Sequence, residues 1–253
     1  MKLTGFDGTV TLVTGAAGGI GAALVQLLLD SGAVVVATDR EAPLRAAHPR
    51  LHAHALDVSD AAAVDARVSA VEAEFGPIGF GVNVAGVLHV GEVSGISDAQ
   101  WRSVFAVNTD GVFHLGRALA RVMTPRRRGA IVTVSSNAAG VPRHGMAAYA
   151  ASKAAASMFT RCLGLELAPH GIRCNIVAPG STLTPMQTGM WADDQGAQRV
   201  IAGTPETFKA GIPLGKLAAP EDVAQAVMFL LSDQASHIAM CDLYVDGGAT
   251  LRG

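Results

Sequence analysis

Apolar runs rich in β-branched residues alternate with helical patterns along most of this 253-residue chain. The strand-like runs lie at 9–13, 33–38, 51–56, 78–83, 130–135, 172–178 and 242–245. The helical stretches between them lie at 20–30, 60–75, 98–123, 147–168 and 220–232. Strands that alternate with helices form βαβ units, whose right-handed crossovers place helices on both faces of a parallel sheet. The sequence therefore predicts an α/β fold with a single domain over 1–253, a doubly wound Rossmann sheet of seven parallel strands flanked by helices.

The alternation lapses at 185–213, after the sixth strand-like run. This segment carries large apolar side chains, among them Met186, Met190 and Trp191. An insertion between a strand and the next helix, at the carboxyl edge of a parallel sheet, lies over the ligand crevice. We therefore predict a small helical lid at about 185–213. The alternative is a surface excursion whose apolar residues simply pack against the domain.

Composition and charge argue against several classes of partner. The formal net charge is −2 at pH 7, which gives no electrostatic reason to expect nucleic acid or an anionic membrane surface. The apolar stretch at 22–37 is interrupted by Gln26 and Asp30 and is not suited to crossing a bilayer. The three cysteines show no metal-ligand spacing, and residues 1–8 have no apolar signal-peptide core. We expect a cytoplasmic protein without a metal.

A glycine-rich segment, TGAAGGIG at 14–21, joins the first predicted strand to the first predicted helix. A strand, a glycine turn and a helix N-terminus form a cradle for a nucleotide pyrophosphate, because glycine lets the backbone approach the phosphates and free N–H groups face the anion. The residues expected to line this cradle are Gly15, Gly18, Gly19 and Ile20. The alternative is a tight strand-to-helix turn without a ligand.

Asp39 follows the second predicted strand and favours NAD as the cofactor. A carboxylate at this point accepts hydrogen bonds from the adenosine ribose and repels a 2′-phosphate. Ala16 and Ala17 offer no basic group to a 2′-phosphate, whereas Arg40 does and keeps NADP open as an alternative. Further cofactor contacts are expected where the next two strands end, from Asp57, Val58, Asn83, Ala85 and Gly86.

Tyr149 and Lys153 stand four residues apart in a predicted helix and share one of its faces. Hydride transfer from an alcohol carbon to nicotinamide needs a group that takes the hydroxyl proton and a donor that holds the oxygen. The phenol of Tyr149 fits the first role, since an adjacent ammonium lowers a pKa that is ordinarily about 10. Ser136, which follows the fifth predicted strand, fits the second role. The alternative is a solvated Tyr–Lys pair on an exposed helix.

These motifs resemble those of the short-chain dehydrogenase/reductase family, and the resemblance covers essentially the whole chain. It implies a catalytic tetrad, with a water held by its asparagine and the nicotinamide ribose bound by its lysine; the members are Asn108, Ser136, Tyr149 and Lys153. It also implies a segment that holds the nicotinamide carboxamide, with contacts from Pro179, Gly180, Thr182 and Thr184. Val84 departs from the pattern, since many members have asparagine there. A homotetramer built through the fourth and fifth helices and the C-terminal segment is implied as well.

Three segments around the expected substrate pocket resemble one branch of that family, the 2,3-dihydro-2,3-dihydroxybenzoate dehydrogenases of catechol siderophore biosynthesis. They lie at 142–146, 180–187 and 208–216, and the ending at 236–251 agrees. This resemblance implies NAD-dependent oxidation of the C3 hydroxyl of a cyclohexadiene carboxylic acid, which gives aromatic 2,3-dihydroxybenzoate. The alternatives are a trans-2,3-dihydro-3-hydroxyanthranilate dehydrogenase that gives 3-hydroxyanthranilate, a generic 3-oxoacyl or carbonyl reductase, and a non-catalytic nucleotide-sensing protein.

A small acid of this kind needs a partner for its carboxylate inside a largely apolar pocket. Arg143 is the only arginine between Ser136 and Tyr149, and a guanidinium takes a carboxylate bidentately. Its alternative role is a salt bridge at the surface or between subunits. Other substrate contacts are expected from Met146, Met186, Gln187, Met190 and Trp191. Apolar packing of the lid is the alternative explanation for the methionines and the tryptophan.

Overall fold

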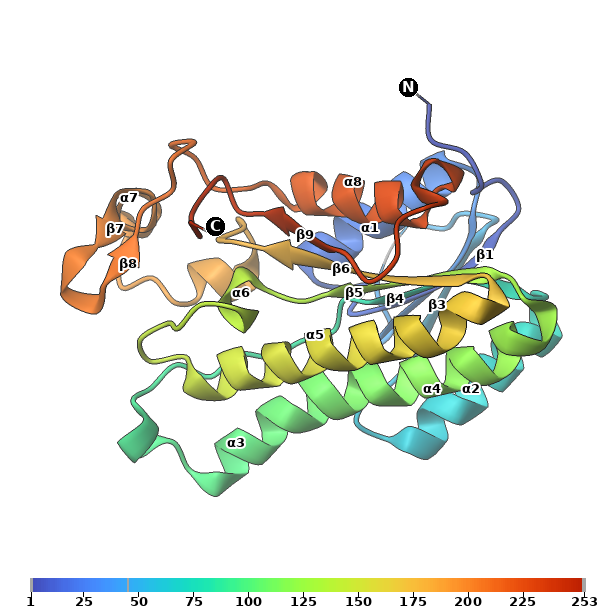
Figure 1. Cartoon of the computed structure of the whole chain (residues 1–253), viewed down its shortest axis with the longest axis horizontal. Helices are drawn as coiled ribbons and strands as arrows, with labels where there is room; N and C mark the ends of the chain where they lie inside the picture. The colour runs from blue at the N-terminus through green and yellow to red at the C-terminus, as the bar shows by residue number, and fades with distance from the viewer. Residues whose placement is uncertain (1, 45, 252–253) are drawn as a thin grey trace.

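The computed structural model describes residues 2–44 and 46–251, which fold around one seven-stranded sheet (Figure 1). Neighbouring strands are all parallel and follow the order β3-β2-β1-β4-β5-β6-β9. The strands are β1 (Val10–Thr14), β2 (Val34–Asp39), β3 (Leu51–Ala55), β4 (Ile78–Asn83), β5 (Gly129–Val134), β6 (Ile172–Pro179) and β9 (Asp242–Val245). The predicted doubly wound sheet of seven parallel strands is confirmed.

Helices cover both faces of the sheet, which is why its central strands are almost continuously apolar. One face carries α1 (Gly19–Asp30) and α8 (Pro220–Leu231), with an apolar core that includes Leu24 and Val227 (Figure 1). The other face carries α2 (Ala61–Glu74), α4 (Gly111–Met123) and α5 (Ala147–Leu167). Within the described part of the chain, no helix combines the length and the apolarity needed to cross a membrane.

The single helix expected at 98–123 is interrupted in the structure. A first helix, α3 (Asp98–Phe105), runs into a π-helical turn at Ala106–Asp110, and α4 follows directly. The two helices follow one another in nearly the same direction (Figure 1), so the apolar periodicity on the two sides of the turn resembles that of one helix. Such turns are rare and are found frequently at functional sites. This one carries Asn108.

The segment 185–213, called the lid segment below, lies beyond the carboxyl ends of the strands (Figure 1). Only part of it is helical, as α6 (Pro185–Thr188), α7 (Gly196–Ala202) and a 3-10 turn at Pro205–Thr207. The rest contains a two-stranded antiparallel hairpin, formed by β7 (Gly203–Thr204) and β8 (Lys209–Ala210). The expectation of a helical lid missed this hairpin, whose strands are too short to show an alternating pattern.

Candidate active site

The loops after β1 and β4 meet where the strand order reverses, which is the point at which doubly wound sheets bind ligands. Gly15 has a φ of 69°, and a Cβ built on it would stand 2.5 Å from the backbone nitrogen of Ala85. A Cβ on Gly21 would stand 2.1 Å from the carbonyl oxygen of Gly15. Both positions therefore require glycine, and the turn has the compactness that a phosphate-binding cradle demands.

The N-terminus of α1 is open to an anion. Its N-cap residue, Gly18, offers no side-chain hydrogen bond, and the described first turn of this helix contains no acidic residue. The first N–H groups of a helix lack partners within it, and the helix dipole favours negative charge there. Thr184 closes the cradle from the loop after β6, since a Cβ on Gly19 would lie 2.8 Å from its methyl carbon. Gly18, Gly19 and Ile20 are thus placed to hold a pyrophosphate.

Asp39 is the last residue of β2, and its carboxylate fastens the glycine turn. One oxygen accepts a hydrogen bond from the Ala17 backbone N–H at 3.0 Å, and the other accepts one from the Arg40 backbone N–H at 2.8 Å. Each carboxylate oxygen keeps a further lone pair, and the partly exposed side chain can still accept a bond from a ribose hydroxyl. The contact with Ala17 is a structural role that the sequence did not reveal.

The other polar residues expected near the adenosine have partners within the chain. The Asp57 carboxylate accepts bonds from the Ser59 backbone N–H at 2.9 Å and the Ser59 hydroxyl at 2.6 Å, which lowers the pKa of Asp57. Val58 is buried beside it. Asn83 is buried too, and its amide donates to the Thr133 hydroxyl at 3.3 Å. Asn83 therefore contributes to the interior of the sheet.

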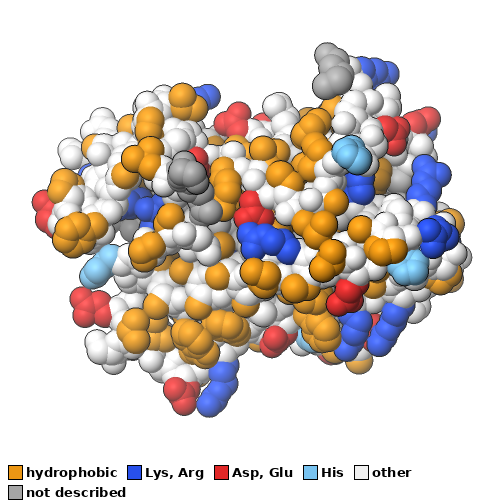
Figure 2. Space-filling model, viewed as in Figure 1, with side chains coloured by type: hydrophobic (Ala, Val, Ile, Leu, Met, Phe, Trp, Pro, Cys, Tyr) orange, Lys and Arg blue, Asp and Glu red, His pale blue; other side chains and the backbone are white. Residues whose placement is uncertain are grey.

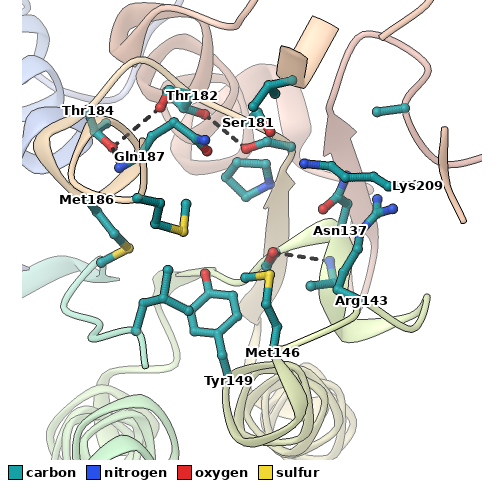
Figure 3. Close-up of a pocket in the computed structure, with 18 of the residues that line it drawn as sticks. Asn137, Arg143, Met146, Tyr149, Ser181, Thr182, Thr184, Met186, Gln187 and Lys209 are labelled. Carbon is teal, nitrogen blue, oxygen red and sulfur yellow. Dashed lines mark hydrogen bonds between the residues drawn. The ribbon is translucent and has the colours of Figure 1, made fainter. Parts of the chain in front are cut away.

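A pocket of about 540 Å³ lies at this edge of the sheet, next to the lid segment (Figure 3). It is lined by fifteen of the expected site residues: Ile20, Gly86, Ser136, Arg143, Met146, Tyr149, Lys153, Pro179, Gly180, Thr182, Thr184, Met186, Gln187, Met190 and Trp191. The expected residues outside its lining are Gly15, Gly18, Gly19, Asp39, Arg40, Asp57, Val58, Asn83, Ala85 and Asn108. Of the expected tetrad, all but Asn108 therefore share one cavity with the candidate substrate contacts.

Tyr149 lies in the first turn of α5 and lines the pocket (Figure 3). Burial raises the pKa of Tyr149 above its usual value, and a hydrogen bond with Ser136 opposes that rise. Ser136 is itself held at the end of β5, where its hydroxyl accepts a bond from the Ala138 backbone N–H at 3.1 Å. The sequence predicts that Lys153 lowers the pKa of Tyr149. In the structure the group that lowers this pKa is Ser136, and the rise caused by burial is larger than the lowering by Ser136.

Lys153 is buried one turn further along α5. Its ammonium donates to the Val134 carbonyl at 3.0 Å and lies 5.8 Å from the centre of the Tyr149 ring. Burial lowers the pKa of Lys153 to about 8. Gly86 lies next to this ammonium, and a Cβ built on Gly86 would stand 3.2 Å from the Lys153 Nζ. The absence of a side chain at Gly86 therefore keeps the pocket side of the ammonium accessible. An ammonium has three donors, so Lys153 has hydrogens left for a ribose hydroxyl.

Asn108 ties the loop after β4 to α5. Its amide nitrogen donates to the Val87 carbonyl at 2.9 Å and to the Ser152 hydroxyl at 3.0 Å, and its amide oxygen accepts from the Val87 N–H at 2.8 Å. Both amide hydrogens are therefore used within the chain. The water that the family resemblance places on this residue stays a prediction.

Lys209 also lines the pocket, although no sequence motif predicted it as a site residue. It lies in β8, at the end of a hairpin that left no periodic signal. The sequence does contain one indication of its role. Lys209 is the only lysine between 185 and 213, the segment expected to cover a site that binds an acid.

Comparison with known proteins gives consistent matches over nearly the full length. Residues 15–250 match the family model described as enoyl-(acyl carrier protein) reductase. The chain is 53% identical to the 2,3-dihydro-2,3-dihydroxybenzoate dehydrogenase of Bacillus subtilis and 43% identical to the vibriobactin-specific enzyme of that name from Vibrio cholerae, with 99% of each chain covered in both cases. The structure of a Brucella melitensis 3-ketoacyl-(acyl-carrier-protein) reductase complexed with NADH is similar, with a TM-score of 0.87 and 31% identity over 98% of this chain and 100% of that one.

Proposed function

This chain belongs to the short-chain dehydrogenase/reductase family of nicotinamide-dependent oxidoreductases, and from that premise we propose that it oxidises 2,3-dihydro-2,3-dihydroxybenzoate to 2,3-dihydroxybenzoate with NAD. One observation carries the proposal. A single pocket joins Tyr149 and Ser136 to Arg143, and among its described lining residues there is no aspartate or glutamate. Such a pocket suits an alcohol that is also an acid. The names of the Bacillus subtilis and Vibrio cholerae relatives support this choice of acid.

The proposed chemistry divides between the cofactor and the chain. When bound, a nicotinamide would supply the acceptor for the hydride that leaves ring C3. The phenolate of Tyr149 takes the C3 hydroxyl proton, and Ser136, whose hydrogen bond lowers the pKa of Tyr149, donates a hydrogen bond to the same oxygen. Lys153 is proposed to bind the ribose of the cofactor. The resulting dienone loses its C2 hydrogen as a proton and gains one on the C3 oxygen. This tautomerisation makes the ring aromatic, so the overall reaction favours the phenol.

A substrate panel with NAD tests the proposal, with NADH formation followed by absorbance. The expected substrate is the dihydroxy acid. Its analogue with an amine at C2 and a set of 3-hydroxyacyl thioesters are the comparison arms. Faster turnover of the amine would assign the anthranilate reaction instead, and faster turnover of the thioesters would assign an acyl reductase. Absence of turnover with every alcohol would identify a nucleotide-binding protein without this activity.

The preference for NAD over NADP is part of the proposal and rests on Asp39. Asp39→Ala is expected to lower kcat/KM with NAD about 10- to 100-fold, because charged hydrogen bonds to a ribose are lost, while kcat/KM with NADP changes much less. Asp39→Asn, which keeps the size of the side chain and removes its charge, is the matched control for the 2′-phosphate repulsion. Equal kcat/KM for the two cofactors in the unaltered protein would contradict the assignment.

A homotetramer is also proposed, with α4 and α5 at a subunit interface. Hydrophobic side chains gather on the surface over these helices (Figure 2), and Phe113, Met158 and Leu165 are exposed there. An exposed apolar patch of this kind is typical of an association surface. Light scattering at micromolar concentration is expected to give about four times the 25.8 kDa of one chain. A monomer mass would contradict the proposal.

We place the reaction in the cytoplasm. Cys162, Cys174 and Cys241 are all free thiols in the structure, and a reducing compartment keeps thiols in that state. Burial raises the pKa of Cys174 to about 12, so this thiol stays protonated and unreactive. Localisation of a tagged chain by cell fractionation is the corresponding test, and recovery outside the cytoplasm would contradict it.

A further inference from the structure

Two cationic side chains occupy one wall of the pocket. Arg143 comes from the loop between β5 and α5, and Lys209 comes from β8 in the lid segment (Figure 3). Figure 3 draws both on the same side of the cavity, and the charge of Arg143 acts on Lys209. Segments far apart in the sequence thus bring two positive charges to the cavity that contains Tyr149.

No carboxylate of the described chain lies within ion-pair distance of either cation. Neither cation takes part in any of the ion pairs found among the described residues. Asp246 attracts Arg143 electrostatically. Its carboxylate, however, already accepts bonds from the Gly248 N–H at 3.0 Å, from the Asn137 amide at 3.3 Å and from the Thr250 hydroxyl. Arg143 and Lys209 therefore face the cavity with N–H donors that are available to a ligand.

Holding these charges together has a cost in free energy. Burial lowers the pKa of Arg143 and of Lys209, and the charge of Arg143 lowers the pKa of Lys209 further. Like charges that are partly shielded from bulk water are unfavourable until an anion joins them. A carboxylate is suited to this place, because its two oxygens accept the planar fork of an arginine and a further bond from an ammonium.

We infer that Lys209 holds the carboxylate of the substrate together with Arg143, an inference that rests on the proposed function. The two cations belong to different parts of the chain, so a bound carboxylate connects the lid segment to the loop before α5. This contact selects acids over neutral ring alcohols, and it positions the ring relative to Tyr149. Lys209 is therefore a specificity-determining residue that acts through substrate binding.

The test compares two ligands that differ only in the carboxylate. Calorimetric titration of the NAD-bound enzyme with 2,3-dihydroxybenzoate and with catechol gives dead-end complexes and needs no turnover. Lys209→Met is expected to weaken binding of the acid about 10- to 100-fold, the loss typical of a charged hydrogen bond, and to change binding of catechol less than about twofold. Lys209→Arg should recover most of the loss. Lys216→Met, which removes an exposed lysine from the same region, is the control and should change neither affinity.

Arg143 provides a second arm of the same experiment. Arg143→Ala is expected to lower kcat/KM for the acid about 30- to 1,000-fold, and Arg143→Lys should recover only part of this, because an ammonium lacks the planar fork. The Arg143→Ala/Lys209→Met double variant should lose less than the product of the two single losses, since both side chains act on one carboxylate. Normal kcat/KM with an altered oligomer mass would place Arg143 at an interface.

The outcomes separate this inference from the proposed function. If Lys209→Met binds the acid normally, or loses the acid and catechol equally, the inference is overturned, whatever the wild-type enzyme oxidises. If the wild-type enzyme fails to oxidise the dihydroxy acid, yet Lys209→Met selectively loses affinity for the acid, the carboxylate contact stands and the proposed reaction falls. Selective loss together with wild-type turnover supports both.

Discussion

Tyr149→Phe is expected to lower kcat about 10²- to 10⁴-fold, because it removes the only group proposed to take the substrate proton. The ring itself remains, so the pocket keeps its shape and the cofactor should bind with unchanged affinity. Stopped-flow measurement of NADH formation gives the rate, and titration with NADH followed by its fluorescence gives the affinity. Both measurements use the same protein preparation, which separates loss of chemistry from loss of folding.

The chain contains a matched control for this substitution. It has two tyrosines, and the second, Tyr244, lies in β9 outside the lining of the pocket. Tyr244→Phe should therefore leave kcat close to the wild-type value. Near-normal turnover by Tyr149→Phe would show that the proton is taken elsewhere and would remove Tyr149 from the proposed chemistry.

Lys153→Met is expected to change activity and stability in opposite directions. Turnover should fall at least about 10²-fold, because the ribose that orients the nicotinamide loses its proposed ammonium partner. Affinity for the cofactor should fall as well, since the donors proposed for its ribose are removed. The cofactor-free protein, by contrast, should unfold at a higher temperature, because a buried ammonium is replaced by an apolar side chain of similar length.

The size of the stability effect follows from two opposing contributions. The lowering of the pKa of Lys153 from 10.5 to about 8 by burial corresponds to about 3 kcal/mol at neutral pH. Loss of the donor to the Val134 carbonyl offsets about 1–3 kcal/mol of this gain. A rise in Tm of up to about 6 °C is therefore expected at equal protein concentration, and a clear fall would contradict the argument. Lys216→Met controls for the loss of one charge.

The same argument predicts a pH dependence. Between pH 8 and 10.5, the folded chain has released the Lys153 proton while the unfolded chain still holds it. Stability of the wild-type protein therefore rises with pH across this window as far as this group is concerned. The advantage of Lys153→Met should be full below about pH 8 and should shrink towards pH 10.5. If the stability of Lys153→Met relative to the wild-type protein grew with pH, the lowered pKa of Lys153 in the folded chain would be contradicted.

The sheet was predictable because its strands are buried on both faces. A segment such as β1 (Val10–Thr14) is buried along its whole length, so β-branched and apolar residues follow one another without a charged residue. The glycine turn was predictable for a similar reason, since Gly15 and Gly21 stand where no side chain fits. These are local constraints, and they leave a direct trace in the sequence.

Features that depend on contacts between distant segments left no such trace. Asn108 looks like any polar residue of an amphipathic helix, and its partners Val87 and Ser152 lie 21 and 44 residues away. Lys209 enters the pocket only because a short hairpin folds back over the sheet edge. The raised pKa of Tyr149 reflects burial in the assembled cavity. Spacing along the chain suggested the neighbouring lysine as the main influence, whereas the folded environment decides.

The two bonds of the Asp39 carboxylate have a consequence for the proposed preference for NAD and for any change of that preference to NADP. One of its oxygens holds the Ala17 N–H, so a substitution that admits a 2′-phosphate also releases part of the glycine turn. A variant altered at residue 39 alone should therefore bind neither dinucleotide well. A productive route to NADP needs a second, compensating substitution that supplies a new acceptor for that N–H. In evolution and in engineering alike, a variant changed only at residue 39 would have low affinity for both dinucleotides and so low activity with either.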